Sequence, residues 1–225
     1  NPDGSGLEQL TDGPFHDYWP CPLPDGGLAM ISTRCRSRFL CWRPQAAVLF
    51  RMDADGRNIR PLSYANLTEW GPSVMTDGRI IWQRSEYQDK GADYSHTLWA
   101  IRPDGTKPEL VFGNTILLPQ GYANGREVPG TQEICCTLIS HFGDLNGPIA
   151  LCDVAKGRFN PEAITSITPE VPWPGYWPRT ECFRDPYPIA RDYFLVSHAP
   201  KDRFGLYVID RYGNRELLYL DPAIG

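Results

Sequence analysis

The 225-residue sequence lacks any apolar run of the roughly 18–20 residues that a membrane-crossing helix needs, and its longest compact apolar stretches are pieces such as Ala46 to Phe50. It also lacks an excess of positive charge, because 22 Lys and Arg residues are set against 27 Asp and Glu residues, a formal net charge of −5. Counterion release on nucleic acid or anionic lipid requires a basic face. We therefore expect no nucleic-acid partner and no membrane insertion.

Several chemical motifs are missing as well. The seven cysteines include no Cys-x-x-Cys pair, which argues against a structural zinc ribbon and against covalent haem attachment. The sequence has no Gly-x-Ser-x-Gly elbow, phosphate loop, dinucleotide fingerprint or His-Glu-x-x-His motif. We accordingly expect no metal and no cofactor within this chain, and we assign no catalytic residue.

Glycine and proline are abundant and spread along the whole length, with 21 and 22 residues respectively. They cost roughly 1 and 3 kcal/mol in a helix interior, so long helices are disfavoured. Aromatic residues make up 12% of the chain and supply large side chains for a core. The composition therefore favours an ordered protein built mainly from strands and turns.

Asp-Gly pairs recur at regular intervals along the sequence. Asp3-Gly4, Asp55-Gly56 and Asp104-Gly105 follow one another at steps of 52 and 49 residues. Asp25-Gly26 and Asp77-Gly78 each follow the preceding pair by 22 residues. Asp-Gly is a favoured hairpin turn because Gly accepts a positive φ and Asp tolerates the neighbouring position. The agreement of two independent spacings indicates an internal structural repeat.

The segments beside these turns are short and apolar at consecutive positions, as in Arg79 to Trp82, Ile134 to Leu138 and Tyr193 to Val196. Consecutive apolar residues in a strand require a sheet that is covered on both faces. Four strands in each unit of about 40–50 residues are typical of a β-propeller. We predict an all-β fold, a β-propeller of four-stranded antiparallel blades.

The predicted propeller domain spans residues 1–225. Its four blades are expected over about 19–62, 71–111, 118–167 and 177–220, preceded by one additional outer strand at about Leu7 to Thr11. The additional strand belongs to a blade whose other strands lie upstream of Asn1. We therefore predict that the chain is a fragment of a larger propeller.

Antiparallel strands send alternate connections to opposite faces of the disc. The Asp-Gly turns share one face, which we call the turn face. The connections between blades (about 12–18, 63–70, 112–121 and 168–176) and those between second and third strands (about 33–46, 85–96, 140–147 and 197–204) share the other, which we call the irregular face. Rigid scaffolds present functional sites on variable loops, so we expect function on the irregular face.

All four histidines fall on this predicted irregular face, together with several other polar residues. The candidate binding residues are His16, Asp17, Arg34, Glu86, Tyr87, His141 and His198. Arg34, Glu86, His141 and His198 lie near equivalent positions of successive repeats, which suggests that they line the mouth of an axial channel. A metal or acid–base site is one interpretation, because imidazole and carboxylate are ordinary ligands. The favoured interpretation is a polar propeller rim without such a site.

The cysteines suggest one covalent link. Cys35 and Cys41 bracket a five-residue insertion on the irregular face and form a disulfide candidate in an oxidising compartment. Free or metal-ligating thiols are the alternative. Cys135 and Cys136 fall in a predicted strand, and we expect them to pack as small hydrophobic residues.

Two repeat segments, Leu-Pro-Asp-Gly-Gly-Leu-Ala-Met (23–30) and Met-Thr-Asp-Gly-Arg-Ile-Ile-Trp (75–82), resemble the Pro-Asp-Gly repeats of TolB-type propellers. His-Asp-Tyr-Trp-Pro (16–20), Asp-Pro-Tyr-Pro (185–188) and Tyr-Gly-Asn-Arg-Glu-Leu-Leu-Tyr (212–219) resemble the propeller region of extracytoplasmic bacterial proteins related to the hydrazine synthase alpha subunit. This resemblance covers most of the chain. It implies a propeller fold and an extracytoplasmic location, periplasmic or secreted.

The same resemblance transfers no catalytic residue. Chemistry in hydrazine synthase depends on covalently attached haems, and this chain has no Cys-x-x-Cys-His. One interpretation is a noncatalytic binding or scaffold module of a larger protein, which engages a partner protein, a polymer or a neighbouring domain through the irregular face. The alternative is part of an enzyme, either a haem-dependent redox complex with its haem elsewhere in a longer parent protein or a hydrolase whose catalytic domain lies elsewhere.

Overall fold

The computed structural model describes residues 3–38, 45–65, 67–86, 96–141, 145–173, 182–201 and 203–223. In these ranges the chain forms antiparallel sheets and short 3-10 turns, and no helix is long and apolar enough to span a membrane. The strands follow one another as four groups of four, each group in sequence order within its sheet. This confirms the predicted fold class.

The strand bounds define the four blades. Blade 1 contains β1 (Asp17–Pro22), β2 (Leu28–Ser32), β3 (Val48–Met52) and β4 (Arg60–Pro61). Blade 2 contains β5 (Glu69–Val74), β6 (Ile80–Ser85), β7 (His96–Ile101) and β8 (Glu109–Phe112). Blade 3 contains β9 (Gly121–Glu127), β10 (Glu133–Ile139), β11 (Ile149–Asp153) and β12 (Ile164–Ser166). Blade 4 contains β13 (Cys182–Pro188), β14 (Tyr193–Ala199), β15 (Gly205–Asp210) and β16 (Arg215–Tyr219).

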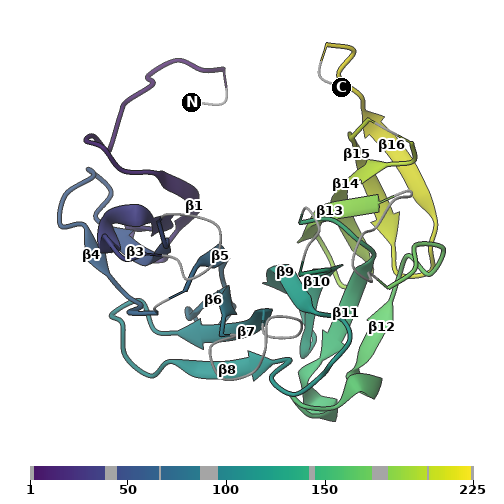
Figure 1. The fold of residues 1–225 in the computed structure, drawn as a ribbon. Coiled ribbons are helices and arrows are strands. Elements are labelled where there is room, and N and C mark those ends of the chain that lie inside the picture. The colour runs from purple at the N-terminus through teal and green to yellow at the C-terminus, as the bar shows by residue number, and fades with distance from the viewer. Residues whose placement is uncertain are drawn as a thin grey trace.

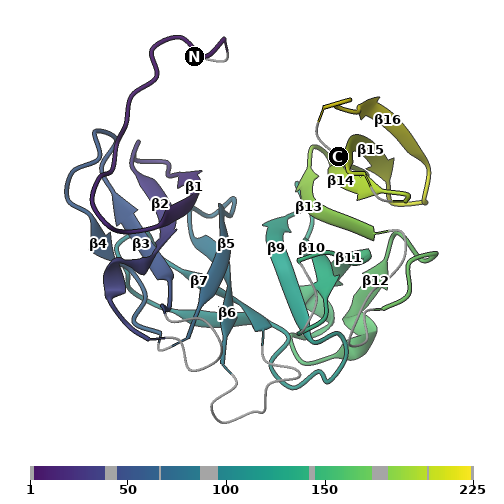
Figure 2. The same cartoon turned by 45° about the horizontal axis from the view of Figure 1, so that its top comes forward.

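Within the described ranges, three 3-10 turns accompany the strands: η1 (Thr33–Cys35), η3 (Val154–Lys156) and η4 (Pro161–Ala163). Blades 2 and 3 join into one hydrogen-bonded sheet through a parallel pairing of His96 with Gly121. Figure 1 shows the four blades placed around an open arc, with blade 1 and blade 4 at its two ends and the first strand of each blade innermost. The same arc is evident after rotation in Figure 2. This arrangement fits a partial propeller.

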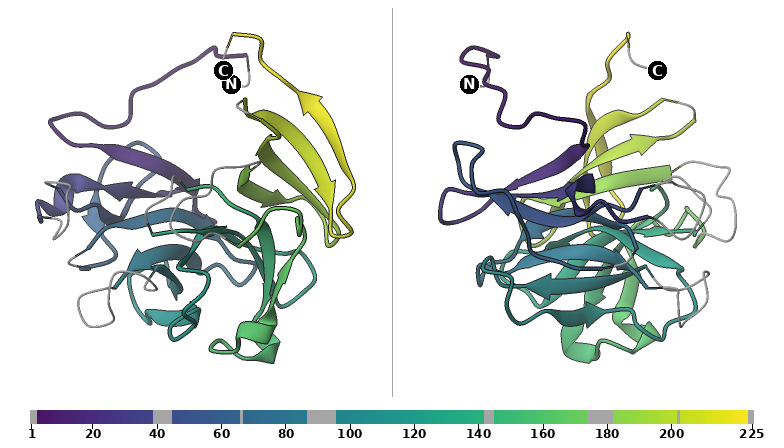
Figure 3. Two further views of the ribbon diagram at one scale, coloured as in Figure 1. Left: turned by 45° about the vertical axis from the view of Figure 1, so that its right-hand side comes forward. Right: turned by 60° about the vertical axis from the view of Figure 1, so that its left-hand side comes forward.

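The additional outer strand predicted at about Leu7 to Thr11 does not form. These residues belong to no strand, and Figure 3 shows the N-terminal segment running away from β1 without joining a sheet. An outer strand needs a neighbouring strand with which to exchange hydrogen bonds. Leu10 instead packs against the apolar cluster of blade 1 that contains Met30 and Phe50.

The Asp-Gly turns form as their side-chain chemistry predicts. The carboxylate of Asp25 accepts a hydrogen bond from the Gly27 N–H at 3.1 Å, and the carboxylate of Asp77 accepts one from the Arg79 N–H at 3.0 Å. In each turn the glycine that follows the aspartate takes a positive φ, +86° at Gly26 and +84° at Gly78. Glycine adopts this conformation without steric cost. The turns therefore close consecutive strands without long loops.

The core lies between the blades, and it explains the consecutive apolar residues. In β6, Ile80 and Trp82 pack in the cluster shared with blade 1, whereas Ile81 packs in the cluster shared with blade 3. All three side chains are fully buried. In β10, Cys136 faces blade 2 and Cys135 faces blade 4, both as buried thiols in apolar clusters. Each middle blade thus has two buried faces.

An arginine crosses each junction between blades. Arg51 Nη1 of blade 1 donates to the Pro103 carbonyl of blade 2 at 3.0 Å. Arg158 Nη1 of blade 3 donates to the Leu110 carbonyl of blade 2 at 2.7 Å. Arg211 of blade 4 forms an ion pair with Glu133 of blade 3 at 2.9 Å. These contacts orient successive blades along the arc.

Candidate functional site

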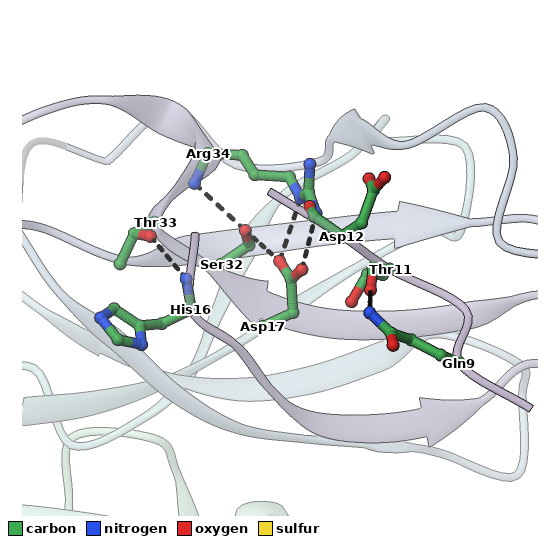
Figure 4. Close-up of polar contacts among 8 residues, drawn as sticks. All are labelled: Gln9, Thr11, Asp12, His16, Asp17, Ser32, Thr33 and Arg34. Carbon is green, nitrogen blue, oxygen red and sulfur yellow. Dashed lines mark hydrogen bonds and ion pairs between the residues drawn. The ribbon is translucent and has the colours of Figure 1, made fainter. Parts of the chain in front are cut away.

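Asp17 and Arg34 form a two-point ion pair on blade 1. Arg34 Nε donates to Asp17 Oδ1 at 3.1 Å and Arg34 Nη2 donates to Asp17 Oδ2 at 2.8 Å, as Figure 4 shows. The Ser32 hydroxyl donates to Asp17 Oδ1 at 2.6 Å, and it accepts from the Arg34 N–H as the N-cap of η1. The end of β2 therefore places the guanidinium directly against the first residue of β1.

The hydrogen bonds of this pair stabilise the ionised form of Asp17. Burial by itself would raise the pKa of the Asp17 carboxyl, but the hydrogen bonds from Arg34 and Ser32 outweigh burial and lower it. A carboxylate with a lowered pKa that is bonded at both oxygens is a poor proton acceptor. The pair is suited to holding structure rather than to general acid–base chemistry.

The segment before β1 is fastened to the same place. Arg34 Nη2 also donates to the Asp12 carbonyl at 2.9 Å, and the Phe15 ring lies 4.7 Å from the Arg34 guanidinium carbon. The backbone N–H of His16 donates to Thr33 Oγ1 at 3.0 Å. In Figure 4 the His16 imidazole points away from the Asp17–Arg34 pair. The His16 side chain therefore lies outside that pair.

Glu86 follows β6 and contacts its own blade. Its Oε2 accepts from the Trp99 indole N–H and from the Thr97 hydroxyl, each at 3.2 Å. The Arg84 guanidinium lies over the Trp99 ring at 4.8 Å, which brings a positive charge beside the carboxylate. Tyr87, the next candidate, lies outside the described residues.

His141 pairs with His96, a histidine that the sequence places on this face without a binding role. His96 Nε2 and His141 Nδ1 are 2.8 Å apart, and the two rings stack with centroids 5.1 Å apart. Burial, together with the charge that His141 can carry, lowers the pKa of His96 to about 3. His96 is therefore neutral at pH 7. Gln120 Oε1 accepts from the His141 N–H at 2.7 Å and thereby fixes the backbone beside the pair.

His198 belongs to the core between blades 3 and 4. Its ring is stacked on Phe183 with centroids 4.0 Å apart, and the Tyr207 ring meets its edge at 4.7 Å. The residue is only 2% exposed. The candidates thus take part in different contacts on different blades, and their binding role remains a prediction. In the described ranges no group of three or more His, Cys, Asp and Glu side chains is placed to hold a metal ion.

The disulfide candidate is only partly described. The Cys35 thiol donates to the Ala46 carbonyl at 3.3 Å. Cys41 lies outside the described residues. The Cys35–Cys41 bond therefore stays a prediction.

The innermost strands share a repeated feature that the sequence motifs above do not predict. One residue in each, namely Trp19, Gly71, Asn124 or Asp185, has a φ between +53° and +55° at a break in strand register. We call these four residues the axial bulges. The Asn124 amide donates to the Asp185 carboxylate of the next blade. Repeated X-Pro pairs, Trp19-Pro20, Gly71-Pro72 and Asp185-Pro186, are the sequence signal that marks three of them.

Large apolar side chains are exposed on the irregular face. Tyr64 is 86% exposed in the connection from β4 to β5, Leu117 is 64% exposed between β8 and β9, and Trp173 is 40% exposed between β12 and β13. We call these three residues the loop-face apolar residues. Each of the three lies in a connection between two blades, next to the ends of the sheets.

The strand order, the inter-blade cores and the axial bulges define the class of this structure, a β-propeller region. No protein-family model matches the sequence, and no curated protein sequence does. Among solved structures, hydrazine synthase of Kuenenia stuttgartiensis matches 99% of this chain with a TM-score of 0.77 at 18% identity. A putative TolB from Agrobacterium tumefaciens matches 88% with a TM-score of 0.59 at 13% identity, and a gluconolactonase of Xanthomonas campestris matches 92% with a TM-score of 0.57 at 15% identity.

These matches show the fold of the chain, which is a propeller of the TolB and hydrazine synthase type. The chain spans 35% of the hydrazine synthase chain, 62% of the TolB chain and 63% of the gluconolactonase chain. The expected structural resemblance to TolB and hydrazine synthase propellers is confirmed over nearly the whole length.

Proposed function

We propose that this chain is a noncatalytic binding module of a larger extracytoplasmic protein, periplasmic or secreted, which holds a partner protein, a polymer or a neighbouring domain on its irregular face. The observation that carries the proposal is the exposure of Tyr64, Leu117 and Trp173 on three successive blade connections of that face. Exposed aromatic and aliphatic side chains on a rigid scaffold are typical of interaction surfaces. The Asp17–Arg34 pair supports this surface by fixing the adjoining loop of blade 1.

Site-specific photo-cross-linking in the source cell tests the binding face. A photoreactive phenylalanine analogue replaces Tyr64, Leu117 or Trp173, one at a time. The matched controls carry it at Phe159 or Tyr212, which are 53% and 80% exposed on the turn face. We expect a discrete cross-linked product from the loop-face positions and none from the controls. Equal cross-linking from both faces, or none from the loop face, would contradict the proposal.

A haem-dependent redox complex is the second candidate function, because hydrazine synthase provides a structural match over 99% of this chain. The residues of this chain do not fit covalent haem, since the sequence has no Cys-x-x-Cys-His. Any haem would be bound by another part of a longer parent protein. A Soret band in the purified full-length protein would support the redox function. An absorption spectrum without that band, together with no bound metal, would favour the binding module.

A further inference from the structure

A cavity of about 220 Å³ lies between blades 2 and 3 on the turn face, opposite the loop-face apolar residues. Its floor is apolar, with the buried side chains of Met75, Val111 and Ile134 and the half-buried side chain of Val154. This space is far larger than a single water molecule needs. Such a hollow accommodates one large apolar side chain.

Ionic side chains also cross the two neighbouring junctions. Between blades 1 and 2, the Arg51 side chain crosses the gap and is only 9% exposed. Between blades 3 and 4, Arg211 and Arg215 reach Glu133 and Glu170 respectively. At the junction of blades 2 and 3, Arg158 crosses to the Leu110 carbonyl, and Arg79 is bonded to Asp77 and Glu109 on its own blade. The cavity lies beside these side chains.

Two opposite charges line this cavity without an ion-pair partner in the described part of the chain. Glu127 ends the innermost strand β9, and its carboxylate accepts a hydrogen bond from the Thr76 N–H. Arg158 lies between β11 and β12, and its guanidinium donates to the Leu110 carbonyl. Thr76 follows the innermost strand β5, whereas Leu110 belongs to the outermost strand β8, so the two charges lie toward opposite ends of the cavity.

We propose that this cavity binds a short free peptide. Its terminal ammonium lies at Glu127, its terminal carboxylate lies at Arg158, and a central apolar side chain packs on Met75, Val111 and Ile134. An extended chain advances about 3.3–3.6 Å per residue, so a tripeptide spans roughly 10 Å and presents its two terminal charges at opposite ends, as the cavity does. The site is independent of the partner surface proposed above, because it lies on the other face.

The three methionines of the chain make the site observable. The chain is labelled with [¹³C-methyl]methionine, which yields three resonances in an NMR spectrum, and Met75→Leu assigns the resonance of the cavity. Met30 and Met52 pack in a separate apolar cluster on the other side of blade 1. The tripeptide Ala-Leu-Ala is then titrated into the sample. We expect the Met75 resonance to shift in a saturable way while those of Met30 and Met52 stay in place.

Altered peptides test each part of the ligand. Acetyl-Ala-Leu-Ala lacks the ammonium, Ala-Leu-Ala-amide lacks the carboxylate, and Ala-Ser-Ala lacks the apolar side chain. We expect each to bind more weakly than Ala-Leu-Ala. A partly exposed ion pair contributes up to about 1 kcal/mol, which corresponds to about a five-fold loss of affinity for each removed charge.

Substitutions in the protein test the same contacts as the altered peptides. Glu127→Gln keeps an acceptor for the Thr76 N–H but removes the charge, so we expect it to lose the preference for the free ammonium. Arg158→Gln is expected to lose the preference for the free carboxylate. Glu162→Gln and Arg57→Gln change exposed charges elsewhere on the turn face and serve as controls. Equal binding of the capped and uncapped peptides, or shifts of all three methionines, would overturn the proposal.

Discussion

Glu69 is a carboxyl group with no exposed surface, at the junction between blades 1 and 2. Its Oε2 accepts from the Leu49 N–H of β3 at 2.7 Å, and its Oε1 accepts from the Ser63 hydroxyl at 2.7 Å. Burial raises the pKa of the Glu69 carboxyl above its ordinary value of 4.5, against the opposing effect of these hydrogen bonds. This single residue therefore makes the stability of the junction depend on pH.

The sign of that dependence follows from the raised pKa. The folded state holds the Glu69 proton more tightly than the unfolded state does. The stability that the protonated carboxyl contributes is therefore fully present below pH 4.5 and is lost as pH rises through the folded pKa. Relative to Glu69→Gln, we expect the wild-type free energy of unfolding to fall with rising pH, by up to about 1.4 kcal/mol per pH unit. Urea unfolding from pH 4.5 upward measures the difference. Glu162→Gln, at an exposed site, serves as the control, and parallel pH profiles for wild type and Glu69→Gln would contradict the prediction.

The innermost strand of each blade is shaped by its axial bulge. At Gly71 a side chain would meet two obstacles, because the φ is +55° and a Cβ at this position would lie 2.5 Å from the Asn124 Oδ1 of the next blade. Trp19 and Asp185 accept a similar φ with a side chain, and Asn124 does so while it bonds to Asp185. The strands are therefore bent at equivalent places, and three adjacent bulges lie in contact.

A comparison of Gly71→Ala with a control variant should separate the cost of the positive φ from the cost of the contact with Asn124. The positive φ alone costs an alanine about 1–2 kcal/mol, and the contact with Asn124 adds about 1–3 kcal/mol. Gly78→Ala is the matched control, since its φ is +84° and a Cβ there meets nothing within 4 Å. We expect Gly71→Ala to destabilise the chain more than Gly78→Ala in urea unfolding.

A double-mutant cycle checks the cause of the extra cost. In an Asn124→Gly background the obstructing amide is gone, so the penalty of Gly71→Ala should fall to that of Gly78→Ala. Additive penalties would show that the Asn124 side chain does not limit the approach of the two strands.

The molecule as a whole is an open arc, so the sheet of blade 4 has one covered face and one uncovered face (Figure 1). Phe194 and Val196 of β14 are buried against blade 3. Successive side chains of a strand alternate between faces, so Tyr193 and Leu206 belong to the other side, where they are 53% and 42% exposed. Blade 4 therefore presents apolar surface at the end of the arc.

We expect a chain of these 225 residues to associate with a second copy through this side of blade 4, because exposed apolar residues on one face of a sheet favour association. Sedimentation velocity over a range of concentrations measures the effect. Tyr193→Lys or Leu206→Lys should weaken association, whereas Tyr212→Lys, which changes an 80% exposed tyrosine on the turn face, should not. A chain that is monomeric throughout, or variants that behave alike, would contradict this expectation.

The sequence predicted much of the fold but little of the candidate site. Asp77-Gly78 specifies its turn through contacts within three residues, and Ile80 to Trp82 specify a strand covered on both faces, so both signals are local. The segment at Leu7 to Thr11, predicted as an outer strand of a further blade, is in no strand among the described residues, because pairing depends on a neighbour that its own residues do not provide. His198 lies within the core although its polarity suggested a rim position.

The sequence by itself determined the repeat, the positions of the tight turns and the need to bury both faces of the middle sheets, because each follows from nearby residues and strand periodicity. Only the tertiary structure decided which side chains meet. His96 and His141 are 45 residues apart in the chain, Asn124 and Asp185 are 61 apart, and the cavity beside Met75 is built from two blades. Contacts of this kind depend on the angle and spacing at which one blade packs on the next, and those are properties of whole sheets rather than of any local pattern.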